Sequence, residues 1–306
     1  MSTLLTKKRV KTKIGKTAGD KVLDLVIALV LIIMSVVAIY PLYYTIIASM
    51  SNPVLVGEGK VWLLPLDITT AAYEKLYEQK NIWIGYRNSL IYTFGYTFTN
   101  LLVTLPCAYA MARKTLPGQK AFFMYFLICM YFSGGTIPSY LIANSLGLIN
   151  TMWIMIIPQG VGVFYLIICR NYFEGNIPDS LFEAATIDGA SVTQFFIRFV
   201  VPLSKPIIAT MALYFSVGHW NSYLIPMIYI QDTKKQSLQV LIRSVTAALD
   251  NTAMENMDPS EISKMQAERQ LLKYAVVVVS ALPLMLLYPF VQKFLINGVM
   301  VGAVKE

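Results

Sequence analysis

The sequence predicts an all-α membrane protein with six transmembrane helices, and two observations lead to this fold class. Hydrophobic residues make up 56% of the 306 residues and charged residues only 14%, whereas soluble domains carry about a quarter charged residues. In addition, no Lys, Arg, Asp or Glu occurs in three long stretches, 88–112, 121–169 and 206–231. A transmembrane helix needs about 20 mostly apolar residues. Six segments meet this requirement: 22–48, 88–112, 121–143, 150–169, 206–230 and 274–294.

The first of these spans is expected to remain in the protein. It follows the basic stretch KKRVKTKIGK, as the apolar part of a signal peptide would. Its apolar run is longer than the roughly 7–15 residues of a signal peptide, and no A-x-A cleavage site follows it. We therefore expect residues 1–21 to form an N-terminal segment and residues 22–48 to form an uncleaved transmembrane helix.

The distribution of basic residues predicts the orientation. Six spans place both termini on one side of the membrane. If that side is the cytoplasm, the inner segments hold 15 basic and 7 acidic residues, and the outer segments hold 10 of each. Cytoplasmic segments carry an excess of Lys and Arg. We therefore expect the N-terminal segment 1–21 and the tail 295–306 to be cytoplasmic, and the loops 49–87 and 231–273 to be extracellular.

A polar segment, residues 178–203, lies between the fourth and fifth spans on the cytoplasmic side. Ser180 and Glu183 have the S-x-x-E spacing of a capping box, in which each side chain accepts a hydrogen bond from the backbone of the other residue. A short helix is therefore expected from there to about Asp188. Gly189 can then adopt the left-handed conformation that ends many helices.

A second short helix is expected after this turn. Ser191 and Gln194 repeat the capping-box spacing, and Pro202 prevents the helix from continuing. Three aromatic side chains of this helix would lie against the bundle or the membrane interface: Phe195, Phe196 and Phe199. Two interpretations of the helix–turn–helix stay open, because it is either a docking element for another protein or an amphipathic connector that only covers the membrane surface.

The stretch EAATIDGASVTQFFIRFVVP resembles the EAA loop of permease subunits of ATP-binding cassette (ABC) importers. That pattern is EAA, three residues, Gly, nine residues and then I-x-L-P. Phe199 and Val201 stand where the pattern has Ile and Leu, and the other positions match: Glu183, Ala184, Ala185, Gly189 and Pro202. The resemblance implies that this loop couples the permease to an ATPase, through Glu183, Ala184, Ala185, Asp188, Gly189 and Pro202.

The resemblance extends along nearly the whole chain. Five stretches are similar to MalG-like permeases for carbohydrate uptake, and most of all to permeases of the LplC/YtcP type: GYRNSLIYT, NLLVTLPCAYAMARKTLPGQK, IPSYLIANSLGLINTMW, WNSYLIPMIYI and GVMVGAVKE. This implies a type I ABC importer permease fold with a core over residues 88–294, in the plasma membrane of a bacterium. It also implies a tail that reaches the ATPase interface, although Glu306 replaces the expected Gly; its candidate residues are Gly298, Gly302 and Lys305.

Subunits of this kind act in larger assemblies. The resemblance implies a second, unlike permease subunit, two ATPase subunits, an extracellular solute-binding protein and a carbohydrate substrate, most simply an oligosaccharide. This chain is expected to be no enzyme and to hold no cofactor, with ATP and Mg²⁺ on the ATPase subunits, because it has no G-x-x-x-x-G-K-[ST] motif. The stretch FSGGT at 132–136 faintly resembles the ATPase signature LSGGQ. It lies in an apolar span, where its glycines indicate close packing or a helix break.

His219 is the only histidine, and it lies in the fifth span beside Trp220 and Asn221. An ionisable group at that depth normally faces the bundle interior or a cavity. These three residues are therefore candidates for the translocation path, where an aromatic face and polar groups would contact sugar. The alternative is an interhelical hydrogen bond that holds the bundle together, in which case the partner permease would carry the substrate site.

Other classes of protein agree less well with the sequence. A secondary transporter would carry charged coupling residues inside its spans and inverted repeats. An intramembrane enzyme would need a nucleophile–base pair or a metal-binding constellation, for which only His219 is available. A nucleic-acid-binding protein would suit the net charge of +8 but not basic residues that border apolar spans. The cysteines match no disulfide or metal spacing and are predicted to be small apolar packing residues: Cys107, Cys129 and Cys169.

Overall fold

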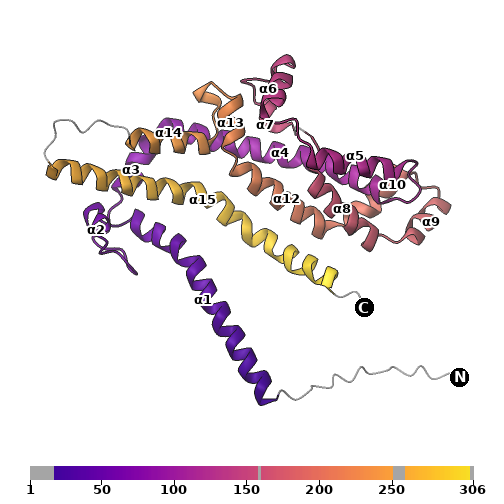
Figure 1. Cartoon of the computed structure of the whole chain (residues 1–306), viewed down its shortest axis with the longest axis horizontal. Coiled ribbons are helices and arrows are strands. Elements are labelled where there is room, and N and C mark those ends of the chain that lie inside the picture. Colours follow the sequence, from indigo (N-terminus) through magenta and orange to yellow (C-terminus); the bar gives the residue numbers. More distant parts are fainter. Residues whose placement is uncertain (1–16, 158–159, 251–258, 304–306) are drawn as a thin grey trace.

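The computed structural model describes residues 17–157, 160–250 and 259–303, and every regular element within these ranges is a helix. This confirms the predicted all-α class. In Figure 1, α4 (Lys80–Ala112), α8 (Val163–Asn176) and α12 (Lys205–Trp220) lie along one another in an elongated bundle. The long helix α15 (Pro259–Ala303) runs beside this bundle, in contact with α12 and α14 (Leu238–Asp250).

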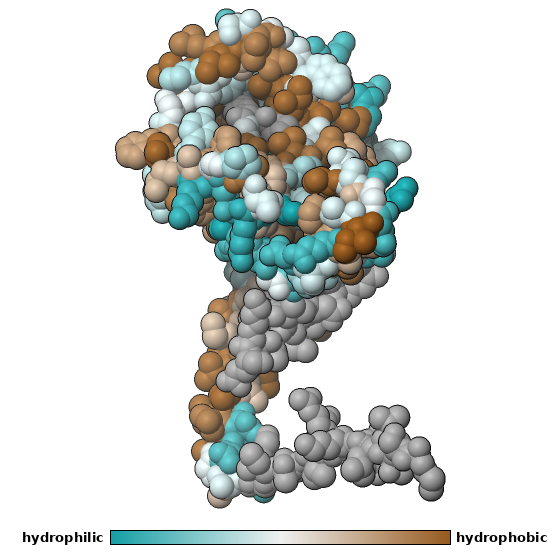
Figure 2. Space-filling model, turned by 90° about the vertical axis from the view of Figure 1, so that its right-hand side faces the viewer, coloured by the Kyte–Doolittle hydropathy of each residue, from teal (hydrophilic) through white to brown (hydrophobic). Residues whose placement is uncertain are grey.

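Helix α1 (Ala18–Ser49) covers the expected first span. It begins with a capping box, in which the Asp20 N–H donates to Thr17 Oγ1 over 3.3 Å and the Thr17 N–H donates to the Asp20 carboxylate over 2.8 Å. Apolar side chains surround the helix and are exposed along most of its length, as expected of a helix in contact with lipid. Only its last residues, Ile47, Ala48 and Ser49, are buried. Helix α1 therefore leaves the bundle as an apolar column (Figures 1 and 2).

The apolar segments differ in how straight they are. Among the described residues, α1 and the Met265–Pro289 part of α15 are the two helices long and apolar enough to cross a membrane alone. Two bent pairs meet the same criteria if each pair forms one span. The pair α5 (Gln119–Tyr131) and α6 (Thr136–Ser145) bends by 110°, and the segment Val192–Leu203 bends by 81° relative to α12.

The expected third span, 121–143, is thus not a single straight helix. Helix α5 ends at Tyr131, and Gly135 before α6 has a φ of +85°, which glycine adopts at little cost. The stretch FSGGT is therefore a helix break, one of the two roles expected for its glycines. The fourth and fifth expected spans are also divided, the fourth into α7 (Trp153–Ile156) and α8 and the fifth into α12 and α13 (Leu224–Tyr229).

The two segments expected as extracellular loops are largely helical. Residues 49–87 contain α2 (Pro53–Gly57), α3 (Ala71–Glu78) and the first turns of α4, and residues 231–273 contain η2 (Thr233–Lys235), α14 and the first turns of α15. Tertiary contacts stabilise them, because Lys75 of α3 forms a 2.6 Å ion pair with Glu268 of α15. The segment 231–273 is also joined to α4, since Asn88 Nδ2 donates to the carbonyls of Lys234 and Gln236 over 2.8 and 3.0 Å.

The main core lies where α4, α8 and α12 meet, and it extends into the segment after α8. Buried residues of all three helices form one cluster with three residues of the polar segment: Ala185, Phe195 and Val200. The predicted packing role of the cysteines holds only in part, because Cys169 is buried, Cys107 is half-buried and Cys129 is exposed. The polar segment is therefore part of the folded body, although its turn points away from it.

Candidate functional site

The first helix of the polar segment is α9 (Asp179–Ile187), at the right-hand end of the molecule in Figure 1. Its length agrees with the prediction, but the Ser180–Glu183 capping box does not form. Pro178 occupies the N-cap position and no side chain caps the helix. Ser180 consequently lies inside the first turn, too far along the helix to act as its cap. The carboxylate of Asp179 in the first turn is instead placed favourably toward the positive end of the helix dipole.

The turn after α9 has the predicted left-handed glycine. Gly189 has a φ of +79°, its N–H donates to the Thr186 carbonyl over 3.0 Å, and the N–H of Ala190 donates to the Ala185 carbonyl over 2.9 Å. This pair of bonds is a Schellman motif, which requires a left-handed residue at the position of the glycine. The direction in which α9 leaves the chain therefore depends on Gly189.

The second helical segment begins with the predicted capping box. The Ser191 N–H donates to Gln194 Oε1 over 3.0 Å, and the Gln194 N–H donates to Ser191 Oγ over 3.3 Å. The segment then runs through α10 (Val192–Phe195), a π-helical turn (Phe196–Val200) and α11 (Val201–Leu203). The expected end at Pro202 is wrong by one residue. Because the π-turn interrupts the α-helical ladder, Pro202 stands in a first-turn position, where its missing N–H costs little.

Aromatic and cationic side chains hold α9 against the bundle. The guanidinium of Arg113, at the end of α4, lies 3.5 Å from the centre of the Phe182 ring, at cation–π distance. Arg113 Nη1 also donates to Tyr109 Oη over 3.1 Å. On its other side, Phe182 meets the fully buried Phe195 edge to face, with ring centres 5.2 Å apart. The sequence analysis did not identify Phe182 or Arg113 as site residues. The one local signal was the spacing of three residues between Phe182 and Ala185, which places both on the same face of the helix.

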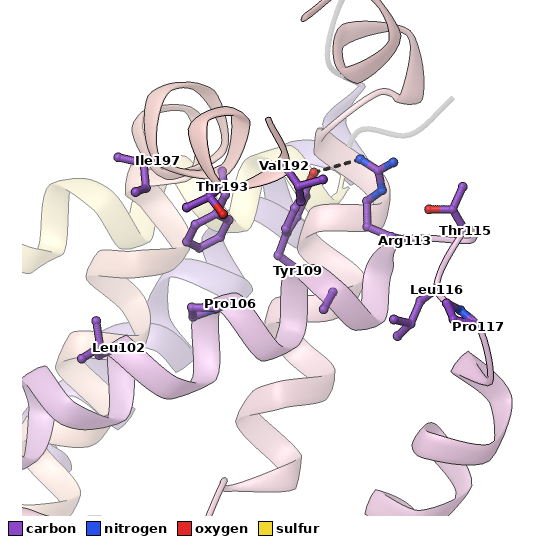
Figure 3. Close-up of a pocket in the computed structure, with 12 residues that line it drawn as sticks. Leu102, Pro106, Tyr109, Arg113, Thr115, Leu116, Pro117, Val192, Thr193 and Ile197 are labelled. Carbon is purple, nitrogen blue, oxygen red and sulfur yellow. Dashed lines mark hydrogen bonds between the residues drawn. The ribbon is translucent and has the colours of Figure 1, made fainter. Parts of the chain in front are cut away.

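An apolar cavity of about 590 Å³ lies beside this anchor, between the end of α4, the loop after it and the start of α10. Figure 3 shows Pro106 below Val192 and Thr193, the Tyr109 side chain rising from α4 toward Val192, and Arg113 at one side with its hydrogen bond to Tyr109. A smaller cavity of about 300 Å³ shares Tyr109 and Arg113 with the first and is also lined by Phe182 and Asp179 among others. The α9–α10 unit is thus held by its buried side chains in the main core and by the contact between Phe182 and Arg113, with these two cavities beside them.

The outward face of α9 is exposed. Ser180, Glu183, Ala184 and Ile187 follow the i, i+3, i+4, i+7 spacing of one helix face, and all are exposed. Ile187 is 87% exposed. The side chain of Glu183 forms no hydrogen bond or ion pair within the described residues. Ala185 is buried against the bundle instead. Figure 2, which looks onto this end, shows a hydrophilic band across it.

The candidate path residues have different surroundings. His219 is buried and stacks on Tyr96 of α4, with ring centres 4.2 Å apart. Trp220 is buried, and its Nε1 donates to the Ser280 carbonyl of α15 over 3.0 Å. The interhelical hydrogen bond considered for His219 is thus made by its neighbour, while His219 contributes a ring contact. Asn221 alone of the three is exposed, and its Nδ2 donates within its own helix to the Val217 carbonyl.

The predicted tail begins as a continuation of α15, which extends to Ala303. Gly298 and Gly302 therefore lie in a helix rather than in a tail that leaves the sixth span at residue 295. Lys305 lies outside the described residues.

Comparison with known proteins places this arrangement in context. Residues 82–301 match the family described as binding-protein-dependent transport system inner membrane component. The chain is 35% identical to the protein LplC of Bacillus subtilis (strain 168), over 94% of this chain and 97% of LplC. It is 33% identical to the polygalacturonan/rhamnogalacturonan transport system permease protein YtcP of the same organism, over 94% of this chain and 99% of YtcP.

A solved structure has the same fold. A chain of a bacterial ABC transporter involved in the import of the acidic polysaccharide alginate superposes with a TM-score of 0.78 and 30% identity, covering 91% of this chain and 98% of that one. The predicted resemblance to ABC importer permeases is confirmed, and with it the role of a membrane permease component rather than an ATP-hydrolysing subunit. The chain belongs to the family of binding-protein-dependent transport system inner membrane components.

Proposed function

We propose that this chain forms half of the translocation path of an ATP-driven importer for carbohydrate. In this proposal it crosses the plasma membrane of a bacterium six times, with both termini in the cytoplasm. It acts with a second, unlike permease subunit, with two ATPase subunits that hold ATP and Mg²⁺, and with an extracellular solute-binding protein. The EAA loop, residues 178–203, couples it to one of the ATPase subunits.

The division of α9 into two faces supports this coupling role best. Its inner face is held by Phe182 and Ala185, so that the helix moves with α4 and the core. Its outer face presents Glu183, Ala184 and Ile187 to whatever approaches. A surface connector that only covers the membrane would direct its apolar side chains inward, whereas Ile187 points outward beside two carboxylates, Glu183 and Asp188. A large exposed apolar side chain flanked by two carboxylates is what a groove on another protein can bind.

The substrate class follows from the relatives. YtcP is named for polygalacturonan and rhamnogalacturonan, and the structural neighbour takes part in import of alginate. A further relative, 29% identical over 80% of this chain, is the melibiose/raffinose/stachyose import permease protein MelC of Bacillus subtilis (strain 168). We propose an oligosaccharide substrate, with uronic-acid oligomers as the first class to test. The exposed side chain of Asn221 is the path residue best placed to meet it, since His219 and Trp220 are enclosed.

Uptake by the reconstituted importer tests this proposal. The chain is expressed with its neighbouring permease, ATPase and binding-protein genes, purified as a complex and placed in proteoliposomes. We expect uptake of oligogalacturonides to require ATP, the binding protein and both ATPase subunits, with neutral oligosaccharides such as raffinose as the comparison. Uptake that persists without ATPase subunits and follows an ion gradient would favour the alternative, a self-contained secondary transporter of a small polar solute.

The end of α15 provides a second prediction. Deleting residues 298–306 removes Gly298, Gly302 and Lys305, which we propose to contact the ATPase interface, but removes none of the core described above. We expect the truncated chain to assemble with its ATPase subunits and to show less ATP hydrolysis stimulated by the loaded binding protein. The measurement compares stimulated and basal hydrolysis in the same purified complex. An unchanged ratio would exclude the tail from coupling.

A further inference from the structure

Residues 60–66, between α2 and α3, form a short loop whose apolar side chains point outward; we call it the outer loop. Trp62, Leu63 and Leu64 are 67%, 69% and 70% exposed. The loop is nevertheless fixed at its base, because Val61 is buried in a cluster with Ile47 and Ala48 of α1 and Val56 of α2. Three large consecutive apolar residues on a fixed loop are unusual on a surface that faces water.

Hydrogen bonds fix the position of the outer loop along α1. Tyr40 Oη donates to the Trp62 carbonyl over 3.2 Å, and Tyr43 Oη donates to the Leu63 carbonyl. Figure 1 shows the corresponding loop beside the end of α1 that joins α2. Tyr40 lies nine residues before Ser49, the end of the helix, so at 1.5 Å per residue the loop reaches back by roughly 13 Å. It therefore lies alongside the helix rather than beyond its end.

The position along α1 translates into a depth in the bilayer. Asp24 is the last charged residue before the apolar run of α1, and Tyr40 and Tyr43 follow it by 16 and 19 residues. At 1.5 Å per residue these tyrosines stand about 24 and 28 Å from Asp24 along the axis. The hydrocarbon layer of a bilayer is about 30 Å thick. The outer loop is thus placed at the outer boundary of the hydrocarbon layer, where Trp and Tyr gather in membrane proteins.

Polar groups around the loop agree with this depth. Glu58 and Lys60, which form a 2.7 Å ion pair, precede the apolar residues, and the exposed Asp67 follows them. No charged residue lies between Lys60 and Asp67. Trp62 Nε1 donates to the Gly59 carbonyl over 2.6 Å. The polar edge of the indole ring is therefore satisfied, so that the ring can enter an apolar environment without losing a hydrogen bond.

We propose that Trp62, Leu63 and Leu64 insert into the outer interface of the lipid bilayer and anchor the outer end of α1 there. Lipid is the partner that the geometry selects, because the loop surface continues the exposed apolar surface of α1 at the same depth. The anchor fixes how far α1 stands in the membrane relative to α15, which packs on it, and to α2 and α3, which pack on α15. This inference rests on the proposed membrane orientation, and its test separates the two.

The test measures depth with a fluorescent probe in the assembled complex. In a background with Cys107, Cys129 and Cys169 replaced by Ala, Leu63→Cys and, as the matched control, Glu58→Cys are labelled with the environment-sensitive fluorophore NBD. Both complexes are reconstituted in phosphatidylcholine–phosphatidylglycerol nanodiscs with and without lipids nitroxide-labelled near the headgroup. Equal recovery of both complexes by gel filtration shows that neither change disrupts assembly.

We expect the probe at Leu63→Cys to emit at shorter wavelength than the probe at Glu58→Cys, to be quenched by the nitroxide lipid and to be protected from aqueous iodide. Equal iodide quenching at the two positions would overturn the anchor. Protection at Leu63→Cys that appears only when the solute-binding protein is added would also overturn it, because the partner would then be a protein. Labelling of Glu58→Cys in intact cells by a membrane-impermeant maleimide tests the orientation separately. Its failure would remove the loop from the outer leaflet.

Discussion

We expect uptake to fall on the order of tenfold or more when Gly189 is replaced by Val, while the protein should still insert in the membrane. The left-handed conformation that Gly189 adopts, with φ of +79°, costs an L-residue roughly 1–2 kcal/mol, and a β-branched side chain tolerates it least. In the Val variant, the native turn with its Schellman hydrogen bonds from Gly189 and Ala190 then competes with another turn, which directs α9 differently. A shift of 1.4 kcal/mol corresponds to about a factor of ten in the population of the correctly oriented helix.

Conformation rather than space is the cause expected for this loss, and a second variant at the same position tests that cause. A Cβ atom added at Gly189 would meet nothing within 4 Å, so steric clash is not the reason. Asn tolerates the left-handed region better than other non-glycine residues. Gly189→Asn should therefore keep most of the uptake that Gly189→Val loses. Membrane abundance, ATPase co-purification and uptake are measured together for both variants, and equal loss in both would show that bulk at the turn, not backbone conformation, impairs coupling.

The parts of the site that the sequence predicted are those determined by local chemistry. The turn at Gly189 and the capping box of Ser191 and Gln194 depend on residues only three or four positions apart, whose backbone preferences can be read directly. The box expected at Ser180 failed for an equally local reason, because Pro178 starts the helix two residues earlier. The S-x-x-E spacing was present, but it could not show that Pro178 would take the N-cap position and leave the helix without a side-chain cap.

The parts that the sequence did not predict depend on distant residues. Phe182 meets Arg113 across 69 positions of the chain, and no pattern around either residue indicates the other. The helices within residues 49–87 and 231–273 pack on distant parts of the chain: α3 contacts α15, with Lys75 and Glu268 paired, and α14 contacts α4. We predicted these segments to be loops because of their charged residues. A helix that packs at the membrane surface is as polar as a loop, so charge content does not distinguish the two.

The outward face of α9 leads to the second large effect, which is expected from Ile187→Asp. If Ile187 enters a groove of the ATPase, a carboxylate there remains buried without a partner, and losses of 2 kcal/mol or more are typical of such central interface residues. We therefore expect about a thirtyfold weaker association with the ATPase subunits. Folding should be unaffected, because the Ile187 side chain is exposed and contacts no core residue. Co-purification of the ATPase over a series of salt concentrations measures the effect.

The matched control places the same charge on another side of the same helix. Thr186 is also exposed but lies about 100° around the helix from Ile187, so Thr186→Asp has the same effect on the helix dipole without altering the outward face. Glu183→Ala provides a further comparison. Since Glu183 caps nothing, its removal should leave the stability of α9 unchanged and weaken ATPase binding alone. If Thr186→Asp impaired association as much as Ile187→Asp while Glu183→Ala had no effect, α9 would be sensitive to charge in general, and the outward face would not be the docking surface.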